Sequence, residues 1–265
     1  MDRQDLDLFR HWFNGFCSSF RLNDPAEQRN IALKEHHTFR VCANIRRIAR
    51  AEGLGDGGVA LAETVGLFHD LGRFPQYHRY RTFRDSDSVN HAELAADLLV
   101  QEMVLDKLSH DEQIAIIHAV RHHNVFAIPD DPTGGNSFWL KLIRDADKLD
   151  IWRVFLDFYR LPQEEKASAV SLGFPDLPGC SPDALDSLSR GEMVNLASVA
   201  TLNDFKLLQI SWVYDLNFAE SFRMIQERNY LEQLAAELPS GPRIRSALDS
   251  VRTFATTALH DGQGL

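Results

Sequence analysis

Apolar side chains recur at three- and four-residue spacing through most of the chain, and this periodicity restricts the fold more than any other feature. The first segment carries four phenylalanines with this spacing: Phe9, Phe13, Phe16 and Phe20. Such spacing predicts an amphipathic helix. No segment of convincing length alternates apolar and polar residues, as a half-buried strand would. The sequence therefore predicts an all-α protein.

Capping residues and loop-forming residues mark where several helices begin and end. Asp24 suits an N-cap and Pro25 the first helical position, so a helix should begin there and end near Glu52, before a cluster of glycines. Ser109 and Glu112 have the spacing of a capping box ahead of another helix. Further helices are predicted over 59–71, 91–108, 137–159, 205–218 and 242–260, with an irregular stretch over 72–89 and a connection over 162–182.

Composition excludes several classes of protein. No apolar run approaches the roughly 20 residues needed to cross a bilayer, and the polar, acidic start does not resemble a secretory signal. The formal net charge of −10 argues against a large nucleic-acid partner, because phosphate backbones attract an excess of Lys and Arg. Three widely spaced cysteines without a CxxC pair favour free thiols. We therefore expect a cytoplasmic protein.

One aspartate falls on the apolar face of a predicted helix. Leu140, Ile143, Ile151 and Val154 share a face with Asp147. An inward carboxylate without a partner is very costly, so it must become protonated, form an ion pair or bind a metal. A cap or an ion pair is the commoner explanation for a single such residue.

Two other segments also place ionisable side chains on apolar faces. His37 lies between Leu33 and Val41 at four-residue spacing. His69 and Asp70 end an apolar segment, where Gly66 would allow another helix to approach closely. A single inward histidine is more often hydrogen-bonded than metal-bound. Three segments that each offer inward His or Asp nevertheless suit a metal site assembled from several helices.

The motifs HHTFRV, GLFHDLGRF and IRDADKLD together resemble those of the HD-domain phosphohydrolase superfamily. On that resemblance, which covers roughly residues 33–155, His37, His69, Asp70 and Asp147 match the metal ligands in order. GRFPQYHRY and VNH further resemble a bacterial subgroup of uncharacterised HD-domain proteins. The resemblance implies an HD-like helical bundle over about 25–160 and a helical extension over about 181–260, within a single all-α domain of residues 1–265.

Some members of this superfamily hold a second ion with additional histidines. His91 and His123 match these by position, and His122 or His118 could be a third ligand. The alternative for His118 and His122 is an exposed helix end. The HH doublet also resembles the HD-GYP branch, but no GYP follows it. Nitrogen and oxygen donors suit one or two divalent ions such as Mn, Fe, Co, Ni or Zn.

The resemblance implies that Asp70 and His69 are catalytic, with Asp70 bridging two ions and a metal-activated water attacking phosphorus. Arg73 is the basic residue nearest the doublet, and we expect it to be catalytic as well. A small phosphate ester, such as a nucleotide or a related molecule, is the expected substrate. Dense basic charge after the doublet suits phosphate binding, and we expect Arg73, Arg79, Arg81 and Lys148 to contact the phosphate. A solvated loop neutralised by nearby acids is the alternative.

Two other functions fit the same residues. Some proteins with this scaffold use a di-iron pair to activate oxygen, and others could sense a metal or nucleotide without turnover. The residues beyond the connection carry no recognisable motif. Their helices could complete the core, cover the site or form a homodimer interface.

Overall fold

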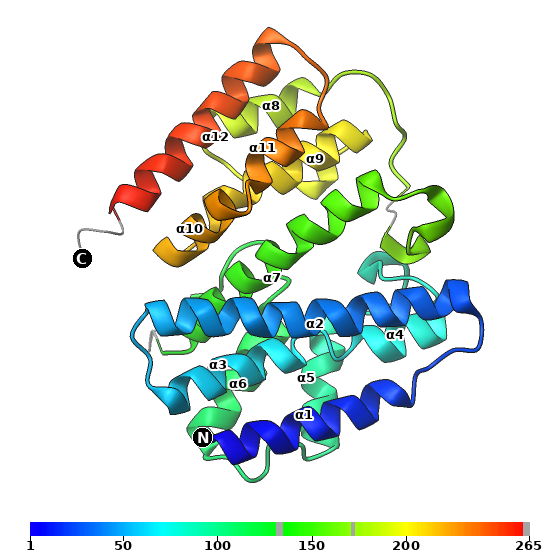
Figure 1. The fold of residues 1–265 in the computed structure, drawn as a ribbon, viewed down its shortest axis with the longest axis vertical. Helices are drawn as coiled ribbons and strands as arrows, with labels where there is room; N and C mark the ends of the chain where they lie inside the picture. Colours follow the sequence, from blue (N-terminus) through cyan, green and yellow to red (C-terminus); the bar gives the residue numbers. More distant parts are fainter. Residues whose placement is uncertain (131–134, 171–172, 262–265) are drawn as a thin grey trace. The chain divides into compact units, whose positions relative to one another are not determined.

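The computed structural model describes residues 1–130, 135–170 and 173–261. These residues form helices joined by turns, with no strand among them, which confirms the all-α prediction (Figure 1). The chain divides into two compact units. The first contains Met1–Val154 and Arg160–Val170, and the second contains Phe155–Tyr159 and the described residues from 173 onward.

The first unit contains the predicted metal ligands. Its helices are α1 (Arg3–Ser18), α2 (Pro25–Ala51), α3 (Asp56–Phe68), α4 (Arg73–Tyr80), α5 (His91–Gln101), α6 (His110–His122) and most of α7 (Gly135–Arg160). α3 packs against α1, α2 and α6, and α5 packs against α6 (Figure 1). Phe9 and Phe13 of α1 are buried against Phe68 and Phe74, with ring centroids 5.7 and 5.8 Å apart.

Two contacts join the helices that carry the site. A Cβ added at Gly66 of α3 would lie 3.1 Å from the Ile45 side chain of α2, so the close approach expected at this glycine is present. Asn44 of α2 is buried and donates from Nδ2 to the Ala146 carbonyl of α7 at 3.0 Å. α2 is therefore held against both helices that carry the other predicted ligands of the first ion.

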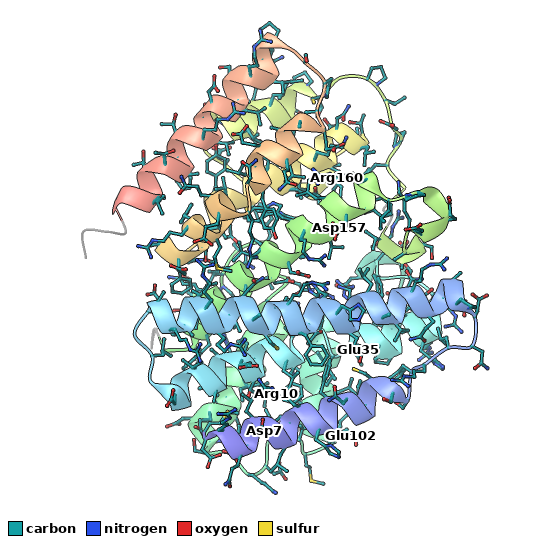
Figure 2. All side chains as sticks on the ribbon, in the orientation of Figure 1. Asp7, Arg10, Glu35, Glu102, Asp157 and Arg160 are labelled. Atoms are coloured by element: carbon teal, nitrogen blue, oxygen red, sulfur yellow. The ribbon has the colours of Figure 1, made fainter. Side chains whose placement is uncertain are left out.

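Charged side chains also join α1 to α3. Arg10 donates to Asp7 on its own helix at 3.1 Å (Figure 2). It also contacts Glu63 of α3. Glu63 is buried, and Arg46 of α2 lies 3.4 Å from its other oxygen. Because an unpaired buried carboxylate would be costly, the two arginines stabilise this part of the unit.

The structure corrects two predicted boundaries. The stretch expected to be irregular contains α4, in which Pro75 occupies the first turn, where a missing N–H breaks no helical hydrogen bond. The helix expected over 91–108 ends at Gln101. Met103 there has φ +50°, and Val104 N–H donates to the Leu99 carbonyl at 3.1 Å, which closes a Schellman motif without glycine.

The second unit holds the remaining helices: α8 (Pro182–Ser189), α9 (Leu202–Ser211), α10 (Ala219–Glu227), α11 (Tyr230–Ala236) and α12 (Pro242–Asp261). α12 packs against α8 and α10, and α9 packs against α8 and α11. The predicted extension over 181–260 falls in this unit, and the grouping of both units into one domain stays a prediction. Among the described residues, no helix is both long and apolar enough to cross a membrane.

Candidate metal centre

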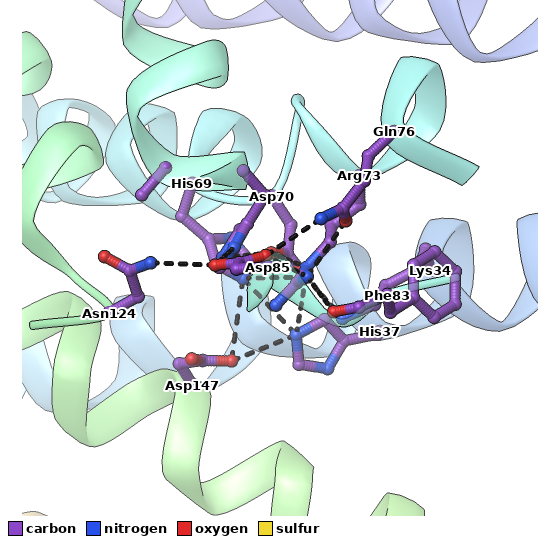
Figure 3. Close-up of polar contacts among 12 residues, drawn as sticks. Lys34, His37, His69, Asp70, Arg73, Gln76, Phe83, Asp85, Asn124 and Asp147 are labelled. Atoms are coloured by element: carbon purple, nitrogen blue, oxygen red, sulfur yellow. Dashed lines mark hydrogen bonds and ion pairs between the residues drawn. The ribbon is translucent and has the colours of Figure 1, made fainter. Parts of the chain in front are cut away.

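Six of the side chains predicted as metal ligands lie together in the first unit. Figure 3 shows His37, His69, Asp70 and Asp147 among them. They come from α2, from the residues directly after α3 and α6, from the start of α5 and from α7. They form three overlapping groups whose donor atoms lie within 4.8 Å of one another: His37, His69 and Asp70; His69, His123 and Asp147; and Asp70, His91 and His123. Side chains separated by more than a hundred residues therefore reach one place.

The four clustered imidazoles share one arrangement of hydrogen bonds. Each Nδ1 faces an oxygen outside the cluster: Asp150 Oδ2 at 2.7 Å for His37, the Gly66 carbonyl at 2.8 Å for His69, Asp85 Oδ2 at 2.7 Å for His91 and the Val120 carbonyl at 2.8 Å for His123. Such an acceptor holds the proton on Nδ1 and fixes the plane of the ring. The Nε2 atoms are then the atoms left to bind an ion.

The Nε2 atoms face one another in pairs. Those of His37 and His69 are 3.3 Å apart, and those of His91 and His123 are 3.1 Å apart. Two neutral rings that both carry the proton on Nδ1 cannot hydrogen-bond through Nε2, because each then offers only a lone pair. The donor set therefore fits a divalent ion placed between the paired nitrogens better than it fits a network of hydrogen bonds.

Asp70 lies between the two histidine pairs. Its Oδ2 is 3.5 Å from His37 Nε2 and 3.6 Å from His69 Nε2. Its Oδ1 is 3.4 Å from His91 Nε2 and 4.0 Å from His123 Nε2. One carboxylate oxygen thus faces each pair, which suits a bridging ligand between two ions.

Burial determines the charge of the second pair of histidines. Burial, together with the charge of Arg73, lowers the pKa of His91 to about 4. Burial lowers the pKa of His123 to about 3, and repulsion from His91 and His69 adds to this effect. Both rings are neutral near pH 7, which is the state that binds a metal ion.

The first pair has a more negative environment. Burial would lower the pKa of His37, but the neighbouring carboxylates of Asp147 and Asp150 raise it. His37 Nε2 lies 3.0 Å from Asp147 Oδ1. Although burial would raise it, the pKa of Asp70 lies well below its ordinary value, mainly because of the neighbouring Lys34 charge. The site therefore holds ionised carboxylates beside imidazoles, a donor set that suits first-row divalent ions.

His118 and His122 lie outside these groups. Their rings lie side by side on α6, with centroids 4.6 Å apart and planes tilted by 43°, as expected for residues one turn apart. His122 Nδ1 lies 2.9 Å from the His118 carbonyl. Of the histidines near the end of α6, His123 is the one that the structure places with the other donors.

The four residues predicted to bind phosphate do not all lie at the centre. Arg73 lies at the site, with Nε 3.4 Å from Asp70 Oδ1. Arg79 is exposed beside the Tyr80 ring, and Arg81 contacts Glu27 at 3.4 Å. Lys148 is buried, with its ammonium 3.5 Å from the Arg144 carbonyl. Arg73 is therefore in contact with one of the clustered donors.

Sequence reasoning missed three residues that contact the cluster. Asp150 and Asp85 accept hydrogen bonds from ligand histidines, and Lys34 donates to Asp70 Oδ2 at 2.7 Å. Asp150 and Lys34 each lie three residues from a predicted ligand on the same helix, which brings their side chains to neighbouring positions. That spacing was a usable signal. Asp85 lies in a loop, where periodicity gives none.

The fold and this centre together define a helical protein with a buried histidine–aspartate cluster that could hold a divalent ion. Residues 35–152 match the family model described as HD domain, and all six clustered side chains lie within that match. Residues 35–152 are therefore identified as an HD domain, as the three motifs predicted, and proteins of the HD-domain superfamily are generally metal-dependent hydrolases. No curated protein and no solved structure matches the chain.

Proposed function

We propose that this protein is a metal-dependent phosphohydrolase that acts on a phosphate ester of a small molecule such as a nucleotide. The observation that carries the proposal is the position of Asp70 between two pairs of Nε2 atoms, one pair facing each carboxylate oxygen. Divalent ions bound there would supply a nucleophile near neutral pH and offset charge on the phosphoryl oxygens.

The residues of the first unit have separate roles in this proposal. His37, His69, Asp70 and Asp147 would hold one ion, and Asp70, His91 and His123 would hold the other. Asp150 and Asp85 orient histidine rings through Nδ1.

Arg73 is the arginine positioned to bind a phosphate oxygen. It is itself held by Asp85 Oδ1 and Gln76 Oε1, both at 2.9 Å. A guanidinium fixed in this way is well placed for a bidentate phosphate contact. Replacing Arg73 with alanine should therefore raise KM or lower kcat on a phosphate ester.

The test is a screen of the purified protein with added Mn²⁺. The panel contains p-nitrophenyl phosphate, bis(p-nitrophenyl) phosphate and nucleoside mono-, di- and triphosphates, and it separates monoesterase from diesterase activity. We expect turnover of at least one substrate and loss of this activity in EDTA. In Asp70→Ala the activity should fall more than roughly 100-fold, which exceeds the loss that is typical when the hydrogen-bond partner of a metal ligand is removed. Asp106→Asn, an exposed acid between α5 and α6, is the matched control.

Two results would contradict the proposal. Activity that survives in Asp70→Ala would remove the assigned centre from the reaction. A metal-loaded protein that hydrolyses no member of the panel, but takes up oxygen when loaded with iron, would indicate the oxidative chemistry instead.

A further inference from the structure

Lys34 is a second cation at the centre, and the proposed function leaves it without a role. It lies on α2, one turn before His37, and donates from Nζ to Asp70 Oδ2 at 2.7 Å (Figure 3). Its side chain is 17% exposed, so the ammonium lies at the edge of the site rather than in the core. Within the described residues, Asp70 is its hydrogen-bond acceptor, and the Phe83 ring centroid is 5.3 Å away.

The two oxygens of Asp70 each face one cation. Lys34 lies beside Oδ2, the oxygen that also faces His37 and His69. Arg73 lies beside Oδ1, 3.4 Å away, on the side of His91 and His123. Lys34 therefore occupies space next to the oxygen that the first ion would use, and the ammonium and a divalent ion would compete for it.

The two cations differ in how firmly they are held. Arg73 also donates to Asp85, to Gln76 and to the Phe83 carbonyl, so its guanidinium would stay in place if it lost Asp70. Lys34 has a flexible four-carbon stem. The Phe83 ring offers its ammonium a favourable neighbour after it leaves the carboxylate.

We infer that Lys34 is a phosphate-binding residue that exchanges Asp70 for a substrate phosphate oxygen when the first ion binds. This inference rests on the proposed function. A divalent ion on Asp70 Oδ2 repels the neighbouring ammonium, and a phosphate oxygen at the centre attracts it. Lys34 thus neutralises Asp70 before loading and contributes positive charge toward the substrate afterwards.

If Lys34 makes this exchange, removing its charge should affect the affinity for Mn²⁺ and the affinity for phosphate differently. In Lys34→Met, Mn²⁺ should bind at least as tightly as in the wild type, because a competing cation is gone. Inorganic phosphate should bind the Mn-loaded variant roughly 10-fold more weakly, because a charged hydrogen bond is lost. Lys34→Arg should retain most of the phosphate affinity, and Lys107→Met, an exposed lysine outside the centre, should change neither. Both affinities are measured by isothermal titration calorimetry.

Other combinations would overturn the inference. Weaker binding of both ligands by Lys34→Met would assign Lys34 a structural role. Tighter Mn²⁺ binding with unchanged phosphate binding would mean that it only neutralises Asp70. If the Mn-loaded wild type hydrolyses an ester but Lys34→Met binds phosphate normally, this inference alone fails. If the Mn-loaded wild type neither binds phosphate nor hydrolyses an ester, the proposed function fails as well.

Discussion

The orientation of His37 depends on a carboxylate that lies outside the predicted ligand set. Asp150 is buried and accepts from His37 Nδ1 through Oδ2 at 2.7 Å. Its other oxygen accepts from Arg40 Nε at 2.8 Å and from Arg153 Nε at 3.0 Å. Two arginines thus fix the carboxylate that fixes the imidazole, and His37 has little freedom to turn its Nε2 away from the centre.

Replacing Asp150 with asparagine should therefore weaken metal binding without removing a ligand. The amide can still contact His37, but it loses the negative charge that favours an Nδ1 proton and an Nε2 lone pair. Mn²⁺ affinity should fall roughly 10- to 100-fold, as is typical when the outer partner of a ligating histidine is lost. Calorimetric titration measures the change, with Asp106→Asn as control and thermal melts to check folding. Equal affinity in Asp150→Asn and the wild type would contradict this role.

The sequence predicted the clustered donors better than the residues that support them. His37 and Asp147 could be placed because each interrupts an apolar stripe, and helical spacing determines the face on which a side chain lies. Asp85 could not be placed in this way. Its hydrogen bond to His91 depends on the path of the chain after α4, and no periodic pattern specifies that path.

At the scale of helices, the second histidine pair depends on how closely α4 approaches α5. Gly72 precedes α4 and has φ −65°, so any residue could adopt its backbone conformation. Space is the constraint. A Cβ added there would lie 2.2 Å from the His91 carbonyl oxygen and 2.9 Å from the Ala95 nitrogen, and both are backbone atoms. The start of α5, including His91, would have to move.

Gly72→Ala should consequently destabilise the protein by roughly 1–3 kcal/mol, the usual cost of overpacking, and should weaken metal binding through His91. Gly15→Ala is the matched control, because Gly15 lies within α1 and an added Cβ meets no atom within 4 Å. Alanine is the better helix former, so Gly15→Ala should stabilise by about 0.5–1 kcal/mol. Urea unfolding measures both changes. The close approach would have no energetic importance if Gly72→Ala unfolded like the wild type.

The sequence predicted which segments are helical more reliably than it predicted where each helix ends. The α2 terminus could be predicted because Gly53, with φ +74°, suits the left-handed position that closes a helix. The α5 terminus has the same geometry at Met103, where the residue type gives no such signal. Local residue preference therefore indicates the end of α2, whereas it does not indicate the end of α5.

At the scale of the whole molecule, the candidate donors belong to one unit. His37, His69, Asp70, His91, His123 and Asp147 all lie within Met1–Val154. An ion that binds the folded form of a region and not its unfolded form stabilises that region by mass action. Metal binding should therefore stabilise the first unit directly, and the helices from α8 onward supply no donor to the described groups.

Hydrogen exchange followed by mass spectrometry can test this difference between the units. At 100 times its dissociation constant, Mn²⁺ should stabilise the first unit by ~2.7 kcal/mol, which is roughly 100-fold slower exchange for amides that open by unfolding of that unit. Amides of α8–α12 should change far less, EDTA should reverse the protection, and Asp70→Ala should show none. Because the second unit serves as an internal reference, a general effect of Mn²⁺ would appear in both. Equal protection of α12 and α3 would show that binding is not confined to the first unit, and it would contradict the assignment of the ligands to that unit alone.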